Sequence, residues 1–433
     1  MYRPVSEHAA GFIAHTEAST GSTLPPFIKD EFEAYLQCGM LAQGFLRLRC
    51  ADCHHDKLVA FSGKRRGVCP SCGARWISQS AAHLVDQVIP PVPIRQWVLA
   101  LPNGLRLLLA ARPELLTQVV HRVLQGHLLK GAGLQSGQGQ GGAVTLIQRF
   151  GSAANLNIHL HCLVLDGVYR CGADGQAHFV AADAPTEDEL SALLQTLIKR
   201  LMKLFVRRGA LEQEDAQCWP AELDDDDEAS QPLWALQSAA VSYRIAFGQR
   251  AGQKVLTLRG APAPERTPRA RLCAETDGFS LHAAVWVRAH ERGRLEKLCR
   301  YITRPAISDE RIKLDETGQV RLRLKTPWRD GTTHLVMSPL QFMWRLAALV
   351  PRPRLHLIRF HGVLAPNAKL RARLLKRVFD IDMRDCPNCG TRELKMVAPI
   401  VERAVIAVIL AHLGLDPQPP PRAAPGQRKT DQQ

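Results

Sequence analysis

The chain of 433 residues lacks an apolar run of the roughly 18 to 20 residues that a membrane-spanning helix needs. Its best candidate, residues 105–111, contains Arg106 and is soon followed by Pro113. The N-terminus has Glu7 where a secretory signal would have its apolar segment. We therefore expect a cytoplasmic protein without a membrane partner.

The chain also has too few acidic residues to balance its basic ones. There are 41 Asp and Glu against 56 Lys and Arg, which leaves a net charge of +15 and a pI near 9.5. This excess favours a polyanionic partner, with nucleic acid the first candidate and an anionic membrane surface the second. We expect association with DNA of the bacterial nucleoid. The hydrophobic content of 46% is ordinary for a globular protein of two or three domains.

Several of the twelve cysteines occur in Cys-x-x-Cys pairs, which in a reducing compartment indicate metal binding rather than disulfides. Cys50 and Cys53 form the first pair, and Cys69 and Cys72 form the second. Two such pairs supply four thiolates for a closed, tetrahedral structural zinc site. Four unrelated reduced cysteines would not explain the matched spacing.

A third pair, Cys386 and Cys389, has no visible second half in the sequence. It could complete a zinc site across a dimer, use His361 or another remote residue, or bind nothing. Basic residues with an aromatic neighbour follow the first two pairs and recur in the segment 355–371, where they fit DNA contact, although a solvated charge run is the alternative. The residues predicted to contact DNA are Lys64, Arg65, Arg66, Arg75, Trp76, Arg359, His361, Lys369 and Arg371.

A strand is predicted around residues 157–169, which are rich in Leu and β-branched residues. Alternate side chains of a strand share one face, so Asn157, His159 and His161 point the same way. Two imidazoles aimed at one point suit a divalent metal. The alternative is a pair of ordinary half-buried histidines on a sheet face.

A helix is predicted over residues 290–303 and is stopped by Pro305. Tyr301 lies near its end, between Arg300 and Arg304. A hydroxyl in such a positive field favours the phenolate and attracts phosphate. An amphipathic helix in which Tyr301 merely packs is an equal alternative from this segment alone.

These motifs resemble the rolling-circle transposases of the insertion-sequence ninety-one family, relatives of the insertion-sequence common-region elements, within the HUH endonuclease superfamily. The resemblance covers nearly the whole chain. It is carried by the four-cysteine region and by residues 150–153, 157–161, 166–168, 278–283, 300–305 and 360–367.

The resemblance implies that His159 and His161 hold Mg²⁺ or Mn²⁺ and that Tyr301 is the nucleophile. Tyr301 would attack single-stranded DNA at the ends of a mobile element, giving a 5′-phosphotyrosine bond and a free 3′-hydroxyl. Rejoining would need no nucleotide cofactor. A third metal ligand is usual in the superfamily, and Gln148 and His282 are the candidates.

One position departs from many relatives, which carry a second tyrosine four residues before the first. Here that residue is Lys297, on the same helical face as Tyr301, where it could contact the phosphate. The second cleavage would then use either a 3′-hydroxyl or Tyr301 of a second subunit in a homodimer.

The expected fold is α+β, with a central, largely antiparallel sheet forming an HUH core with flanking helices. The expected regions are 1–87, an N-terminal helix and zinc-binding, DNA-binding domain; 88–315, the catalytic domain with a Gly/Gln linker at 131–142 and an acidic solvated loop at 223–228; 316–415, a helical basic region; and 416–433, a disordered tail. Three other functions remain open: a replication-initiator nickase, a non-catalytic zinc-stabilised DNA-binding protein, and a metal-independent tyrosine recombinase.

Overall fold

The computed structural model describes the chain except for residues 62–66, 112–113, 173–176, 215–216, 221–230, 261–270, 366–393, 401–402 and 413–433. The acidic loop 223–228 and the tail 416–433 therefore lie outside the described residues. None of the helices in the described part is long and apolar enough to cross a membrane.

A six-stranded sheet forms the centre of the molecule, and every neighbouring pair in it is antiparallel. Its strands, in spatial order, are β11 (Cys273–Thr276), β12 (Phe279–Val287), β3 (Ile94–Ala100), β5 (Leu156–Leu165), β4 (Gly142–Phe150) and β16 (Ile358–Gly362). This confirms the expected α+β class with an antiparallel sheet. The edge strand β16 comes from the region expected to follow the catalytic domain.

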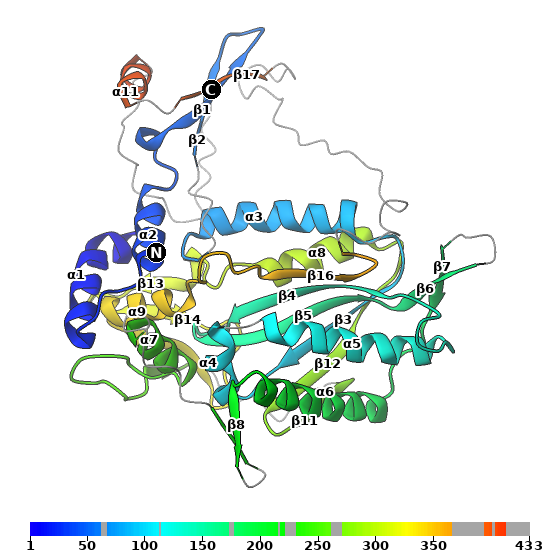
Figure 1. The fold of residues 1–433 in the computed structure, drawn as a ribbon. Helices are drawn as coiled ribbons and strands as arrows, with labels where there is room; N and C mark the ends of the chain where they lie inside the picture. Colours follow the sequence, from blue (N-terminus) through cyan, green and yellow to red (C-terminus); the bar gives the residue numbers. More distant parts are fainter. Residues whose placement is uncertain are drawn as a thin grey trace.

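Helices cover both faces of this sheet (Figure 1). One face carries α3 (Pro70–His83), the π-helical turn η2 (Leu84–Val88) and α8 (Arg292–Thr303), whereas the other carries α4 (Asn103–Ala111), α5 (Glu114–Gly131) and α6 (Glu187–Arg207). The start of α6 is fixed by a capping box in which the Thr186 hydroxyl accepts from Glu189 N. Its leucines recur at helical spacing and are buried, as an amphipathic surface helix requires.

The two faces are set by alternation along the strands. Even-numbered residues of β5, such as Ile158 and Leu160, pack in the large core with α5 and α6. Odd-numbered residues, such as Leu163 and Leu165, pack in a second core with α8 and α3. His159 and His161 therefore lie on the α8 face of the sheet.

A helical layer brings the N-terminal helices together with helices from the second half of the chain. It contains α1 (Tyr2–Thr20), α2 (Pro26–Gln37), α7 (Gln231–Val241) and α9 (Pro339–Leu349). Trp344 on α9 donates its indole N–H to the hydroxyl of Thr16 on α1, at 3.2 Å. Beside this layer lies a four-stranded sheet in the order β10 (Leu256–Arg259), β15 (Thr332–Met337), β14 (Val320–Arg323) and β13 (Ile312–Leu314). Contacts thus cross the expected division at residues 87 and 88.

A smaller sheet projects away from the central one (Figure 1). In it β1 (Phe45–Cys50) lies between β2 (Asp56–Ala60) and β17 (Leu394–Ile400), and Cys50 is the register partner of Leu394. The other elements are the 3-10 turns η1 (Leu41–Gln43) and η4 (Asp309–Arg311), the hairpin strands β6 (Gly167–Cys171), β7 (Ala177–Ala181), β8 (Leu211–Glu214) and β9 (Gln217–Pro220), and α11 (Arg403–His412).

Candidate functional site

The two histidines of β5 lie side by side on the face of the sheet that α8 covers. Their ring centroids are 4.9 Å apart. His159 Nδ1 lies 2.9 Å from the carbonyl oxygen of Asn157, so Nδ1–H donates to that oxygen and Nε2 keeps its lone pair. His161 Nδ1 lies 2.8 Å from Gln96 Nε2 on β3, so the amide N–H donates to that ring nitrogen. Each ring is thus held through Nδ1, and His159 donates there, as a metal-ligating histidine does.

Burial also keeps both imidazoles neutral. It lowers the pKa of His159 to about 4 and that of His161 to about 3. The charge of Arg304 lowers both values further. At neutral pH each ring therefore has one unprotonated nitrogen, as a metal ligand must, and in His159 this nitrogen is Nε2.

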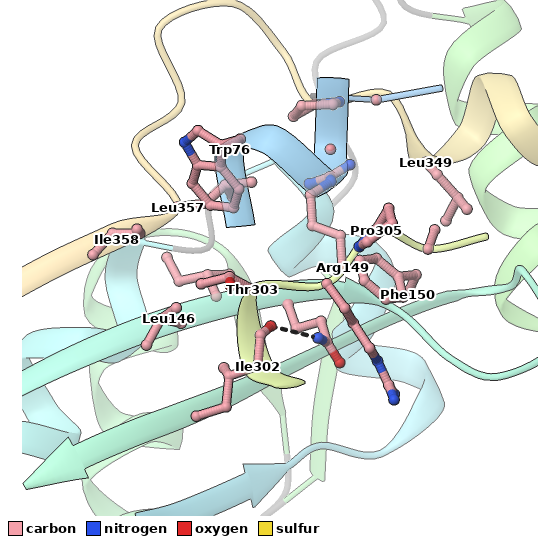
Figure 2. Close-up of a pocket in the computed structure, with 17 residues that line it drawn as sticks. Trp76, Leu146, Arg149, Phe150, Ile302, Thr303, Pro305, Leu349, Leu357 and Ile358 are labelled. Carbon is pink, nitrogen blue, oxygen red and sulfur yellow. Dashed lines mark hydrogen bonds between the residues drawn. The ribbon is translucent and has the colours of Figure 1, made fainter. Parts of the chain in front are cut away.

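Two side-chain amides lie on the same face of the sheet as the histidines. Gln148 on β4 is the register partner of His159. Its Nε2 donates to the carbonyl oxygen of Ile302 on α8 at 2.9 Å, which leaves Oε1 as a possible ligand (Figure 2). Asn157 Oδ1 is buried without a hydrogen-bond partner, on the same strand face as the histidines. Imidazole nitrogen and amide oxygen are both ligands of divalent metals, so these residues fit such an ion.

The other predicted ligand, His282, does not join the pair. His282 is the register partner of Val98 on β3, and Val98 is in turn the partner of His161 on β5. Two strand spacings separate the two histidines by about 10 Å. Because β3 lies between them, His282 is not placed to share an ion with His161.

Tyr301, near the end of α8, is exposed to solvent over 54% of its surface. The guanidinium carbon of Arg304 lies 4.3 Å from its ring centroid, and Lys325 Nζ lies 5.4 Å from the same centroid. Arg304 therefore faces Tyr301 and also acts electrostatically on both histidines. Arg304 thus connects the Tyr301 ring with the histidine pair, and these residues make up the candidate site.

Three cations were predicted around Tyr301, and among the described residues Arg304 is the one of them that lies at its ring. Arg300 forms an ion pair with Glu296, with 2.6 Å between Nη2 and Oε1. Lys297 is exposed, and no contact with Tyr301 is found for it among the described residues. Lys325 was missed in the sequence analysis. This residue follows β14 in the four-stranded sheet, away from α8 in the chain, and it belongs to no recognisable motif.

Three buried cysteines form the one group of potential metal ligands found among described His, Cys, Asp and Glu side chains. Cys38 Sγ lies 3.1 Å from Cys72 Sγ and 3.5 Å from Cys69 Sγ. Cys69 is the N-cap of α3, where its sulfur accepts from Cys72 N. Three thiolates at such separations fit a tetrahedral Zn²⁺ that takes one further ligand.

This cluster corrects the predicted grouping of four cysteines. Cys69 and Cys72 meet Cys38, which follows α2, and are not joined by Cys50 and Cys53. The reason is the course of the chain between β1 and β2, because this hairpin projects away from α3 and carries the first pair at its far turn (Figure 1).

A cleft separates the N-terminal half of α3 from β4 and the end of α8 (Figure 2). Trp76 of α3, Thr303 and Arg304 line it, whereas the Arg149 side chain points away and donates to the carbonyl oxygen of Ala110. At its edge a Cβ built on Gly73 would lie 3.1 Å from Pro305 Cβ. The helix that carries the cysteine cluster therefore packs closely on the segment after Tyr301.

The remaining predicted DNA contacts are divided between interior and undescribed positions. The His361 ring packs against His121 with centroids 4.8 Å apart, and burial lowers its pKa to about 4, so it is not a surface cation at neutral pH. Arg359, on the same strand β16, has a buried Nε without a partner. Lys64, Arg65, Arg66, Lys369, Arg371, Cys386, Cys389 and the side chain of Arg75 lie outside the described residues.

Two family models match the sequence. The transposase family Y2_Tnp matches residues 142–371, which include both histidines and Tyr301. The transposase zinc-binding domain Zn_Tnp_IS91 matches residues 5–101, which include the three-cysteine cluster. No curated protein and no solved structure matches. Because the first match covers more than half of the chain and the second covers the zinc-binding region, the chain belongs to the IS91 family of transposases.

Proposed function

We propose that this transposase nicks and rejoins single-stranded DNA at the ends of a mobile element through a 5′-phosphotyrosine at Tyr301, by the rolling-circle route of HUH endonucleases. The observation that carries the proposal is the position of Arg304, which faces the Tyr301 ring and acts on His159 and His161. A nucleophile, a cation and a neutral histidine pair on one face of a sheet suit phosphoryl transfer.

The exposure of the tyrosines supports the choice of nucleophile. All five tyrosines of the chain lie in the described residues, and Tyr301 alone among them is exposed. Tyr35 and Tyr169 are buried, and the other two are half-buried. An attack on a DNA phosphate needs a hydroxyl that the strand can reach, and Tyr301 meets that condition.

The proposed chemistry assigns each group a task. His159 and His161, with Gln148 as the third ligand, would hold Mg²⁺ or Mn²⁺, and such an ion polarises a phosphate and stabilises its developing charge. The Tyr301 oxygen loses its proton and bonds to phosphorus while the bond from phosphorus to the 3′ oxygen breaks and that oxygen takes up a proton. Attack by a 3′-hydroxyl on the phosphotyrosine restores a diester and the phenol.

The test is covalent trapping on labelled single-stranded DNA from the element ends. Wild type, Tyr301→Phe and the double variant His159→Ala/His161→Ala are incubated with Mg²⁺ or EDTA and run on denaturing gels. We expect an adduct that requires Mg²⁺ and is lost in both variants, while the half-buried Tyr2→Phe serves as a matched control that keeps it. Zinc content is measured throughout, because EDTA must not strip the structural ion.

The outcomes separate the alternatives. Adduct formation that persists in Tyr301→Phe would show that Tyr301 is not the nucleophile. Adduct formation that persists in the double variant of His159 and His161 would favour a metal-independent recombinase. No adduct from zinc-loaded wild type, together with DNA binding, would favour a non-catalytic DNA-binding protein. A transposase joins two element ends in one reaction, so a joint-formation assay distinguishes it from a replication initiator.

A further inference from the structure

We propose that Lys325 and Arg304 together form the seat for the DNA phosphate that Tyr301 attacks. The inference rests on the proposed function and adds to it a residue outside the tyrosine motif. The seat holds the anion before cleavage and again in the phosphotyrosine, so the two cations act in both directions of strand transfer. Neither residue forms or breaks a covalent bond.

Two cations gather at one exposed ring without an acidic partner. Arg304 and Lys325 both lie within 5.4 Å of the Tyr301 ring centroid. Among the described residues no carboxylate forms an ion pair with either, whereas Arg300 beside them is neutralised by Glu296. Like charges held together are costly, and an anion between them removes that cost.

Arg304 adds unused hydrogen-bond donors to this charge. Its Nε and Nη1 are buried and have no hydrogen-bond partner. Buried N–H groups of a guanidinium are costly when unpaired, so each favours an acceptor such as a phosphate oxygen. The site therefore has both the positive charge and unpaired hydrogen-bond donors for a phosphodiester.

Separate elements hold the two cations in place. Both sides of Arg304 in the chain are held in place. The carbonyl oxygen of Ile302 accepts a hydrogen bond from Gln148, and Pro305 packs on Gly73. Lys325 follows Leu324, which is buried and whose N–H donates to the carbonyl oxygen of Thr333 at 2.8 Å. The four-stranded sheet thus brings a lysine to a tyrosine on α8, and the seat forms only when the two parts are packed together.

The first experiment measures single-turnover adduct formation on DNA that wild type cleaves. We expect Lys325→Ala to slow the reaction by about tenfold to hundredfold, which is the usual effect of a lost charge-assisted hydrogen bond. Lys325→Arg keeps the charge and should stay within about threefold of wild type. Lys313→Ala, on β13 of the same sheet and also exposed, is the matched control and should leave the rate unchanged.

A second experiment asks whether Lys325 meets the scissile phosphate itself. The cleavage position is mapped from the free 3′-hydroxyl, and that phosphate is replaced by a neutral methylphosphonate. Binding is compared in the Tyr301→Phe background. With the ordinary phosphate, Lys325→Ala should bind about tenfold more weakly, and with the methylphosphonate the difference should vanish. A difference that survives the substitution would place Lys325 elsewhere on the strand.

The failure of this inference differs from the failure of the proposed function. Adduct formation by Lys325→Ala at the wild-type rate would overturn the seat and leave the nickase intact. If wild type forms no adduct on any element end, the proposed function fails, and the seat is tested by the salt dependence of binding to oligo(dT). Loss of one phosphate contact in Lys325→Ala should lower the slope of log affinity against log salt concentration by about 0.7. An unchanged slope would rule the contact out.

Discussion

Gln96 shows how a residue outside the site can decide what the site does. Its side-chain amide lies 2.8 Å from His161 Nδ1 and is buried. Gln96 Nε2 donates to Nδ1 as the amide is placed. With the amide turned by 180°, Oε1 would accept a hydrogen bond from Nδ1–H, and the lone pair of His161 would stand on Nε2, where an ion would bind. The tautomer of the proposed metal ligand therefore depends on a neighbouring strand.

Replacing Gln96 by Leu should weaken Mn²⁺ binding by about tenfold to hundredfold, the usual effect of losing a hydrogen bond behind a metal ligand. The measurement is a titration followed by electron paramagnetic resonance, so that no DNA or activity is needed. Gln79→Leu, an exposed change on α3, is the control. Equal Mn²⁺ affinity in wild type and Gln96→Leu would show that Gln96 does not orient the ring.

At the scale of single elements, α3 joins the cysteine cluster to the proposed nucleophile. Cys69 caps the helix, and Gly73, one turn later, packs on Pro305. A zinc ion bound at the helix start would hold α3 in position and, through it, the segment after Tyr301.

Cys38→Ser should therefore remove one zinc ion per chain and slow adduct formation, because the remaining two sulfurs do not make a closed site. The exposed Cys171→Ser should change neither quantity. Gly73→Val should slow the reaction with zinc retained, since its side chain meets Pro305. Zinc is counted by mass spectrometry. Full zinc content in Cys38→Ser would contradict the ligand assignment.

The pairing of β17 with β1 bears on the pair Cys386 and Cys389, which lies outside the described residues. Leu394 begins β17 beside Cys50, the last residue of β1. Cys389 precedes Leu394 by a stretch of chain that spans at most roughly 17 Å. We therefore expect a second zinc ion, lost equally in Cys50→Ser/Cys53→Ser and in Cys386→Ser/Cys389→Ser. Independent losses in the two variants would contradict a shared site.

Elements with strong periodicity could be predicted from the sequence. The alternation around His159 predicted β5, and the Arg-Pro stop predicted the end of α8 at Thr303. Cys38 and Lys325 could not be predicted, because each is a single residue without a partner at fixed spacing and reaches its site only by tertiary packing. The position of His282 could not be predicted for the same reason. The sequence shows a histidine on a strand, but it does not show that β3 lies between that strand and β5.

At the scale of the whole molecule, half-buried histidines link stability to pH. His121 on α5 and His361 on β16 pack against each other, and burial lowers the pKa of each to about 4. In the unfolded chain both histidines have a pKa near 6.5. Below that pH the unfolded state therefore binds protons that the folded state does not bind. The stabilisation is present above pH 6.5 and is lost as pH falls towards 4.

The free energy of unfolding should accordingly fall by about 1.4 kcal/mol per pH unit for each such histidine between pH 6.5 and pH 4. Urea unfolding at pH 7.5 and pH 5 measures the change. His361→Gln should reduce it, while the exposed His290→Gln should not. The same pH dependence in wild type and His361→Gln would show that this pair does not carry the linkage.

The place of β16 at the edge of the central sheet has a consequence for synthesis on the ribosome. Among the described strands β4 is its one neighbour in that sheet, and roughly two hundred residues separate the two strands in the chain. At about 5 to 20 residues per second, β4 waits roughly 10 to 40 s for the strand that covers its open edge. A chain released before β16 would expose unpaired strand groups next to the histidine strand. Truncated transposase should therefore aggregate, and a chain ending before residue 358 should appear in the pellet rather than the supernatant after centrifugation.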